Sequence, residues 1–170
     1  TNPHLSGSWT VRTCSFSYFN RAMYKPAGNI GNTFDKVNVF LCNYGMYAKA
    51  SNAPMHAGND TWRDGEISAC DYAAIYYDGT DESATITGGI SLENTIIEGN
   101  AGMGVYAKGV RGEAAPLTLS RVYFELNGTA SCVTIDGDLL TPVDRYLDDA
   151  YAKLHNCGRY SMTLGGQHVV

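Results

Sequence analysis

Basic residues are scarce in this chain. Its 170 residues include 12 Lys or Arg against 17 Asp or Glu, which leaves a formal net charge of −5 at pH 7. A groove for nucleic acid needs a stripe of positive charge to neutralise the phosphates. The composition therefore argues against nucleic acid as a partner.

Long apolar runs are missing as well. No stretch approaches the roughly 20 apolar residues of a membrane span, so no membrane insertion is expected. The first residues, Thr-Asn-Pro-His-Leu, lack the basic start and apolar core of a signal peptide. Because the chain does not begin with Met, we expect it to be a processed or excised piece of a longer protein.

Paired metal-binding motifs are also absent. The five cysteines include no Cys-x-x-Cys pair, and the four histidines lie far apart in the sequence. The sequence therefore predicts no zinc site and no cofactor. An odd number of cysteines favours free thiols, and we expect Cys42 and Cys70 to stack as small buried groups.

Glycine, tyrosine and side-chain amides are plentiful, and they recur in a pattern. The chain has 19 Gly and 12 Tyr. An Asn or Asp returns after 23, 28, 29, 27 and 29 residues, at Asn20, Asn43, Asp71, Asn100, Asn127 and Asn156. A period of 20 to 50 residues indicates a solenoid or a repeat array.

The neighbours of these six residues repeat too. A small residue follows two positions later, at Ala22, Gly45, Ala73, Gly102, Thr129 and Gly158. Four positions earlier the residues are nearly all apolar: Phe16, Val39, Ile67, Ile96, Tyr123 and Ala152. This order is typical of a strand, a tight Asx bend and a second strand. The alternative is six unrelated Asx turns.

Stacked strand-bend-strand units predict an all-β, parallel β-helix of five to six coils, with the six polar residues at one inner corner. We expect one domain over residues 1–170. Its coils cover about 9–137, and residues 138–170 are less regular. The expected strands are 9–18, 36–42, 62–70, 91–98 and 117–126, with shorter ones at 22–25, 45–49, 73–77, 103–108 and 131–135. Residues 142–154 fit a helix, whereas 150–162 fit a sixth coil.

The polar column and phrases such as Ser-Leu-Glu-Asn-Thr-Ile-Ile-Glu-Gly-Asn-Ala-Gly at 91–102 resemble the right-handed parallel β-helix of the pectate-lyase-like superfamily. Among its members they resemble bacteriophage tailspikes. The resemblance implies a homotrimer in the virion tail, joined to other tail proteins and acting outside the host cell. Its partner would be a capsular or O-antigen polysaccharide, bound and often cut by hydrolysis or elimination. The chain is shorter than such spikes usually are.

Glu98 and Glu125 are the candidate catalytic residues. Both lie two positions before the polar column, in consecutive coils, where earlier coils have Tyr18, Leu41 and Ala69. Adjacent coils would place the two carboxylates about 5 Å apart, as in retaining glycosidases. Repulsion would raise the proton affinity of one of them, which suits a general acid beside a nucleophile or base. The alternative is a pair of solvated surface acids.

Further columns suggest substrate contacts. Tyr76 and Tyr106 belong to a stripe with Tyr24 and Tyr47, and such rings can stack on sugars. The stripe could equally be a packed ladder or a seam between subunits. Lys108 and Arg111 are the cations that could neutralise a uronate in a lyase. Lys36, Asp64 and Glu93 are expected to form a surface ion-pair ladder.

Two other classes of function remain open. One is a purely structural shaft of a tail fibre or an adhesin. The other is a secreted polysaccharide lyase or epimerase of the same superfamily. The dispersed acids Asp60, Asp64, Asp71 and Asp78 do not assemble into a calcium site of the pectate-lyase kind.

Overall fold

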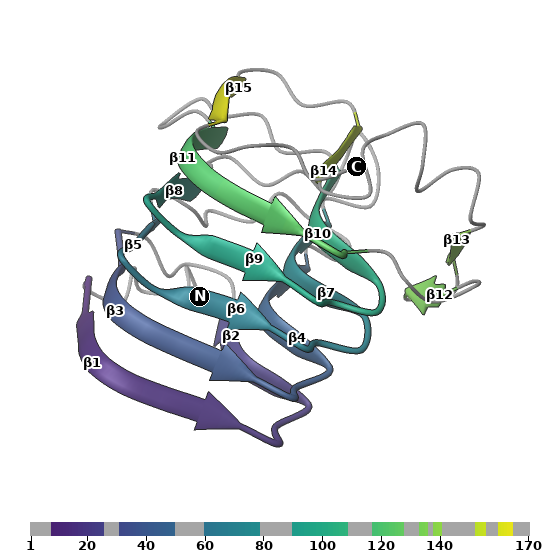
Figure 1. The fold of residues 1–170 in the computed structure, drawn as a ribbon, viewed down its shortest axis with the longest axis horizontal. Coiled ribbons are helices and arrows are strands. Elements are labelled where there is room, and N and C mark those ends of the chain that lie inside the picture. Colours follow the sequence, from purple (N-terminus) through teal and green to yellow (C-terminus); the bar gives the residue numbers. More distant parts are fainter. Residues whose placement is uncertain are drawn as a thin grey trace, which may run out of the picture.

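The computed structural model describes nine stretches of the chain: residues 8–25, 31–49, 60–78, 90–108, 117–127, 133–135, 138–140, 152–155 and 160–164. Within these stretches all regular structure is β, and no helix occurs. The strands form two parallel sheets and one small antiparallel pair (Figure 1).

The first sheet has eight parallel strands. They are β1 (Thr10–Ser17), β3 (Thr33–Phe40), β5 (Asp60–Arg63), β6 (Glu66–Ser68), β8 (Ile90–Glu93), β9 (Ile96–Glu98), β11 (Leu117–Glu125) and β15 (Tyr160–Leu164). The long β3 pairs with β5 and then with β6, and the long β11 pairs with β8 and then with β9. Each short pair is therefore one strand run with an interruption.

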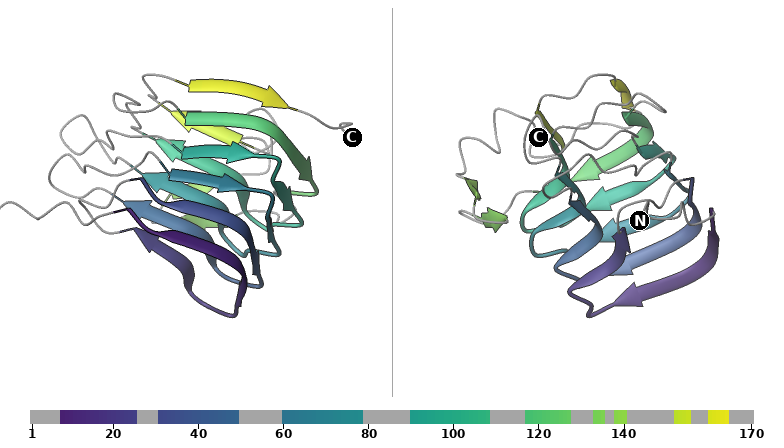
Figure 2. Two further views of the ribbon diagram at one scale, coloured as in Figure 1. Left: turned by 90° about the vertical axis from the view of Figure 1, so that its left-hand side faces the viewer. Right: turned by 180° about the vertical axis from the view of Figure 1, so that it is seen from behind.

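The second sheet has five parallel strands. They are β2 (Arg21–Lys25), β4 (Tyr44–Lys49), β7 (Ala73–Asp78), β10 (Met103–Lys108) and β14 (Ala152–His155). Through β10 the chain alternates between the two sheets, so that a strand run of the first sheet and the following strand of the second make one layer. Successive layers stack along one direction (Figure 2).

Pairing in the first sheet fixes the offset between layers. Thr10 lies opposite Thr33, Thr33 opposite Thr61, Thr61 opposite Ser91, and Ser91 opposite Thr118. The offsets are therefore 23, 28, 30 and 27 residues. The expected spacings were 23, 28, 29 and 27, so the third is one residue too short.

Left-handed residues at constant register bend every layer twice. The first bend is at Thr13, Lys36, Asp64, Asn94 and Arg121, with φ between 48° and 55°. The second bend is at Tyr18, Leu41, Ala69, Gly99 and Leu126, with φ between 51° and 65°. Such a conformation costs a non-glycine residue about 1–2 kcal/mol. Hydrogen bonds to the next layer offset this cost, for example from the Asn94 amide to the Ser120 carbonyl at 2.9 Å.

The predicted polar column divides into two columns. Asn20, Asn43 and Asp71 lie on the outside, where the Asn43 side chain donates to Asn20 Oδ1 at 2.9 Å. Asn100 and Asn127 are buried, and they continue the inner column of Cys42 and Cys70. Equivalent amide bonds show the shift, because both Asp71 and Ala101 donate to a cysteine carbonyl, Cys42 and Cys70 respectively. The expectation of one inner corner was therefore wrong at the fourth layer, which is offset by one more residue.

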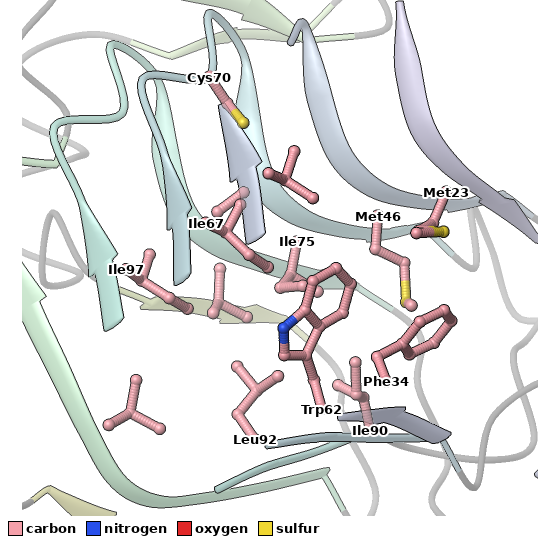
Figure 3. Packing of buried hydrophobic residues seen from close by; sticks show 14 of the residues in the cluster. Met23, Phe34, Met46, Trp62, Ile67, Cys70, Ile75, Ile90, Leu92 and Ile97 are labelled. Atoms are coloured by element: carbon pink, nitrogen blue, oxygen red, sulfur yellow. The ribbon is translucent and has the colours of Figure 1, made fainter. Parts of the chain in front are cut away.

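The core lies between the two sheets. Trp62 and Phe34 of the first sheet stack with ring centroids 4.8 Å apart, and the Trp62 indole donates to the Val37 carbonyl at 3.2 Å. Met46 and Ile75 of the second sheet face them (Figure 3). Cys42 and Cys70 are buried free thiols, as predicted. Burial raises the pKa of the Cys70 thiol to about 12, so this thiol stays neutral.

The C-terminal expectations have mixed outcomes. The strand expected at 131–135 occurs as β12 (Val133–Ile135), but it pairs antiparallel with β13 (Asp138–Leu140), and both lie apart from the two sheets (Figure 1). β14 takes the position beside β10 instead. Residues 152–154 of the possible helix are in β14, so the alternative of a further coil holds there. Asn156 lies outside the described residues.

Asn100→Leu should destabilise the fold strongly. Asn100 accepts from the Cys70 amide at 2.9 Å, donates to the Ile67 carbonyl at 3.3 Å and donates to Asn127 Oδ1 at 2.7 Å. Leucine has a similar shape but makes none of these bonds. Each buried group left without a partner costs about 1–3 kcal/mol. Denaturant unfolding measures the loss.

The control is Asn20→Leu, which removes an exposed member of the same sequence pattern. Because Asn20 is exposed, its free energy of unfolding should change by no more than about 0.5 kcal/mol. Equal effects of the two substitutions would contradict the division into an outer and an inner column.

Candidate functional site

The outer surface between the two bends of the first sheet carries two polar columns. Side chains alternate across each strand. Val37, Val39, Ile67 and Ile97 therefore point into the core. The intervening outward positions form one column of Asn38, Glu66, Ile96 and Tyr123, and a second column of Phe40, Ser68, Glu98 and Glu125.

Glu98 and Glu125 lie directly opposite each other in paired strands. Parallel neighbours are about 4.8 Å apart, so the predicted juxtaposition of the two residues is confirmed. The residues expected before them in the column, Tyr18, Leu41 and Ala69, were wrong. Those three form the second bend, and the column contains Phe40 and Ser68 instead.

Hydroxyl and amide groups hold the neighbouring carboxylates. The Tyr123 hydroxyl donates to Glu125 Oε2 at 2.9 Å, and the Ser68 hydroxyl donates to Glu66 Oε1 at 2.7 Å. The Glu66 amide donates to Asn38 Oδ1 at 3.1 Å. Glu66 and Glu125 are thereby oriented on either side of Glu98.

Glu98 is the carboxyl group of this surface that holds its proton most tightly. Partial burial raises its pKa above the ordinary glutamate value, and the charges of Glu66 and Glu125 raise this pKa further. The hydrogen bond to Glu125 raises the pKa of the Tyr123 phenol. The pair therefore contains a carboxyl group disposed to donate a proton and a carboxylate held by a phenol.

A groove of about 580 Å³ runs along the first bend beside this pair. Its polar walls come from Asn38, Asp64, Glu66, Asn94, Arg121 and Tyr123. Tyr123 and Glu66 belong both to the groove wall and to the surroundings of the carboxylate pair. Arg121 is the cation of the groove wall, and it lies at the first bend opposite Asn94 in register.

Three of these residues escaped the sequence interpretation. Glu66 and Tyr123 occupy the same column, two positions before Ser68 and Glu125, so a polar residue at i and i+2 in successive layers was the available signal. Arg121 gave no signal, because its place in the groove depends on a left-handed backbone that its sequence does not reveal.

The predicted tyrosine platform is a stack of rings. Tyr76 and Tyr106 have exposed fractions of 1% and 3%, and their ring centroids are 5.0 Å apart. Tyr47 stacks on Tyr76 at 5.1 Å, whereas Tyr24 at the end of the stack is exposed. Burial of the inner rings favours the packed ladder over a sugar platform.

The predicted cations do not gather at the carboxylate pair. Lys108 ends β10 of the second sheet, opposite Asp78 and His155, whereas Glu98 is in the first sheet. Arg111 lies outside the described residues.

The expected ion-pair ladder is also different. Asp64 accepts from the Asn94 side chain at 2.7 Å, and Glu93 lies opposite Arg63 rather than Asp64. The expectation that Glu93 continues this column was wrong, because the third offset is 30 residues. The ion pairs at this edge join Arg12 and Arg63 to Asp35, with Nε to carboxylate oxygen distances of 3.5 and 3.4 Å.

The described part of the chain offers no group of three or more His, Cys, Asp or Glu side chains that could hold a metal ion. A search of the same residues for a helix with the length and apolarity to cross a membrane finds none.

Glu98→Gln should reduce the pH dependence of stability. The folded state disfavours ionised Glu98, so the free energy of unfolding should fall as pH rises from the ordinary glutamate pKa through the raised one. Glutamine has no charge to ionise, so this fall should be smaller in the variant. Denaturant titrations over a series of pH values measure the difference.

Glu93→Gln serves as the control, because Glu93 lies before the first bend and accepts from the Ser91 hydroxyl at 2.9 Å. It should retain the pH dependence assigned to Glu98. A wild-type pH profile in Glu98→Gln would show that Glu98 titrates as an ordinary surface acid.

The chain matches no known protein-family model. Searches of the curated proteins and of the solved structures find no match either, so the function is argued from the geometry of this chain.

Proposed function

We propose that the chain is a right-handed parallel β-helix of five to six coils. Two parallel sheets visited in alternation support this proposal, as do the layer offsets of 23 to 30 residues and the two bends at constant register. Each layer then has three straight segments around one core, and each outward position forms a column along the axis.

On this scaffold we propose that the protein binds a bacterial surface polysaccharide and hydrolyses its glycosidic bonds. The observation that carries the proposal is the opposed pair of Glu98 and Glu125 beside a groove of about 580 Å³. Opposed carboxylates with different proton affinities are the usual equipment for glycosidic hydrolysis.

Each member of the pair has a distinct role. Glu98, which keeps its proton to higher pH, donates that proton to the glycosidic oxygen as the bond breaks. Glu125, held by the Tyr123 hydroxyl, attacks the anomeric carbon or activates the water that does so. A separation near one strand spacing favours the nucleophilic role and retention of configuration, because an inverting pair stands about 6.5–9.5 Å apart.

The charges around the groove favour hydrolysis over elimination. Elimination from a uronate needs cations that neutralise the sugar carboxylate. The described lining provides Arg121, whereas Asp64 and Glu66 line the same groove and Glu98 and Glu125 lie next to it. An excess of negative charge repels an anionic sugar chain, so a neutral or amino-bearing polysaccharide suits this site better.

We further propose that the intact protein is a homotrimeric bacteriophage tailspike, as the sequence resemblance implies. A cluster of exposed aromatic residues in the first layer supports assembly, since such patches mark interaction surfaces. Its members are Trp9, Tyr18, Phe19 and Tyr24. A non-catalytic shaft or adhesin would share these features, and the experiments below distinguish it.

Glu98→Gln and Glu125→Gln should each abolish most turnover while retaining sugar binding. Both substitutions keep the shape and remove the acid or the charge, and loss of one member of such a pair costs about 10²–10⁴-fold in rate. The assay measures reducing ends released from a panel of capsular and O-antigen polysaccharides, and calorimetry measures binding. Glu93→Gln is the matched control and should cut normally.

Normal cutting by both variants would exclude the pair from the chemistry. A wild-type protein that binds a polysaccharide and never releases reducing ends would establish the shaft or adhesin instead.

Assembly is tested separately by light scattering. The full-length parent protein should scatter as a trimer, and Tyr18→Ser combined with Phe19→Ser should weaken the trimer if the aromatic cluster is the seam. The exposed residue Asn20 gives a control, Asn20→Ser, that should leave the mass unchanged. A stable wild-type monomer would rule out the trimer.

A further inference from the structure

A charged group is buried at a corner of the molecule away from the groove. It consists of Lys25 at the end of β2, Asn32 just before β3, Asp60 at the start of β5 and Tyr77 in β7. Lys25 is 4% exposed, Asp60 1% and Tyr77 0%. None of these residues lines the groove or takes part in the proposed hydrolysis.

The four residues converge on one carboxyl group. Lys25 Nζ contacts Asp60 Oδ2, and the Tyr77 hydroxyl donates to the same oxygen at 2.7 Å. Asn32 donates to the other oxygen, Asp60 Oδ1, twice: from its backbone amide at 3.0 Å and from its side chain at 2.9 Å. An amine nitrogen therefore lies against a carboxyl group whose two oxygens both accept hydrogen bonds.

Burial changes the chemistry of this contact. A buried ion pair pays a large desolvation penalty, which transfer of one proton from the ammonium to the carboxylate relieves. Burial lowers the pKa of Lys25, although Asp60 acts in the opposite direction, and this favours the nucleophilic amine. Burial raises the pKa of Tyr77, so its phenol stays protonated and remains a donor.

We propose that Lys25 and Asp60 are the two ends of an intramolecular amide cross-link. After proton transfer, Nζ attacks Asp60 Cγ, and the negative charge develops on Oδ1, where the two Asn32 donors stabilise it. The Cγ–Oδ2 bond then breaks. Oδ2 leaves as water with two protons that came from the lysine ammonium, passed with the help of the Tyr77 hydroxyl.

The reaction balances without a further reactant. An ammonium and a carboxylate become one amide and one water, and neither oxidation nor reduction occurs. Formation of a new N–C bond inside the core also removes the buried pair of charges. The product joins the first layer to the third, between positions 35 residues apart.

Mass spectrometry of the intact, denatured wild-type protein tests the proposal. The mass should be lower than that of the sequence by one water molecule. Protease digestion should yield one branched peptide that contains both Lys25 and Asp60, with no cleavage after Lys25. A full sequence mass after prolonged incubation of the folded protein would overturn the proposal.

Peptide mapping separates the cross-link from dehydration of an aspartate alone. A linear Asp60 peptide that has lost water, together with normal cleavage after Lys25, would also overturn the proposal. Because the wild-type chain is measured, the test does not depend on a variant that folds.

Variants then assign the roles. Lys25→Met should show the full mass of its own sequence. Tyr77→Phe retains the pair but should slow the loss of water, and Asn32→Ala should slow it too. The control is Lys49→Met, because Lys49 contacts Asp78 at 3.6 Å in the second sheet and not Asp60. This variant should still lose one water, and its failure to do so would contradict the assignment to Lys25.

Discussion

Parallel pairing in constant register is the constraint on which the rest of this structure depends. Every described layer of the two sheets donates its backbone hydrogen bonds to a neighbour of the same shape, and this lets left-handed residues recur at the same two places. A single layer would carry that strain without compensation. The bends in turn decide which side chains enter the core and which form outward columns, so core and candidate site follow from one pairing pattern.

The candidate site combines features that neither strand has alone. Pairing of β9 with β11 brings two carboxylates to one place, and the first bend opens a groove beside them. The environment then makes the two acids unequal, because partial burial and neighbouring charge act on Glu98, whereas the Tyr123 hydroxyl binds Glu125. Different environments for identical side chains are a common origin of acid and nucleophile roles.

Much of this arrangement was predictable from sequence, because the repeat is written in residue types. The strand positions, the parallel stacking, the buried cysteines and the opposition of Glu98 to Glu125 followed from aligned Asn and Asp residues. The one-residue shift at the fourth layer did not follow, since Asn100 aligns as well with Asp71 as with its true neighbour Cys70. The bends at Lys36 and Arg121 were hidden too, because neither residue type favours a left-handed backbone.

The two faces of the second sheet are both covered in its middle strands, where the described residues of β4 and β7 are almost all buried. Variation there is limited by packing on each side, on the core and on the tyrosine ladder. The outward columns of the first sheet have no such restriction, since a substitution at Phe40 or Ser68 changes what solvent meets without disturbing the interior. New specificities would therefore arise on this surface by moving a functional group one layer at a time, while the opposite sheet stays unchanged.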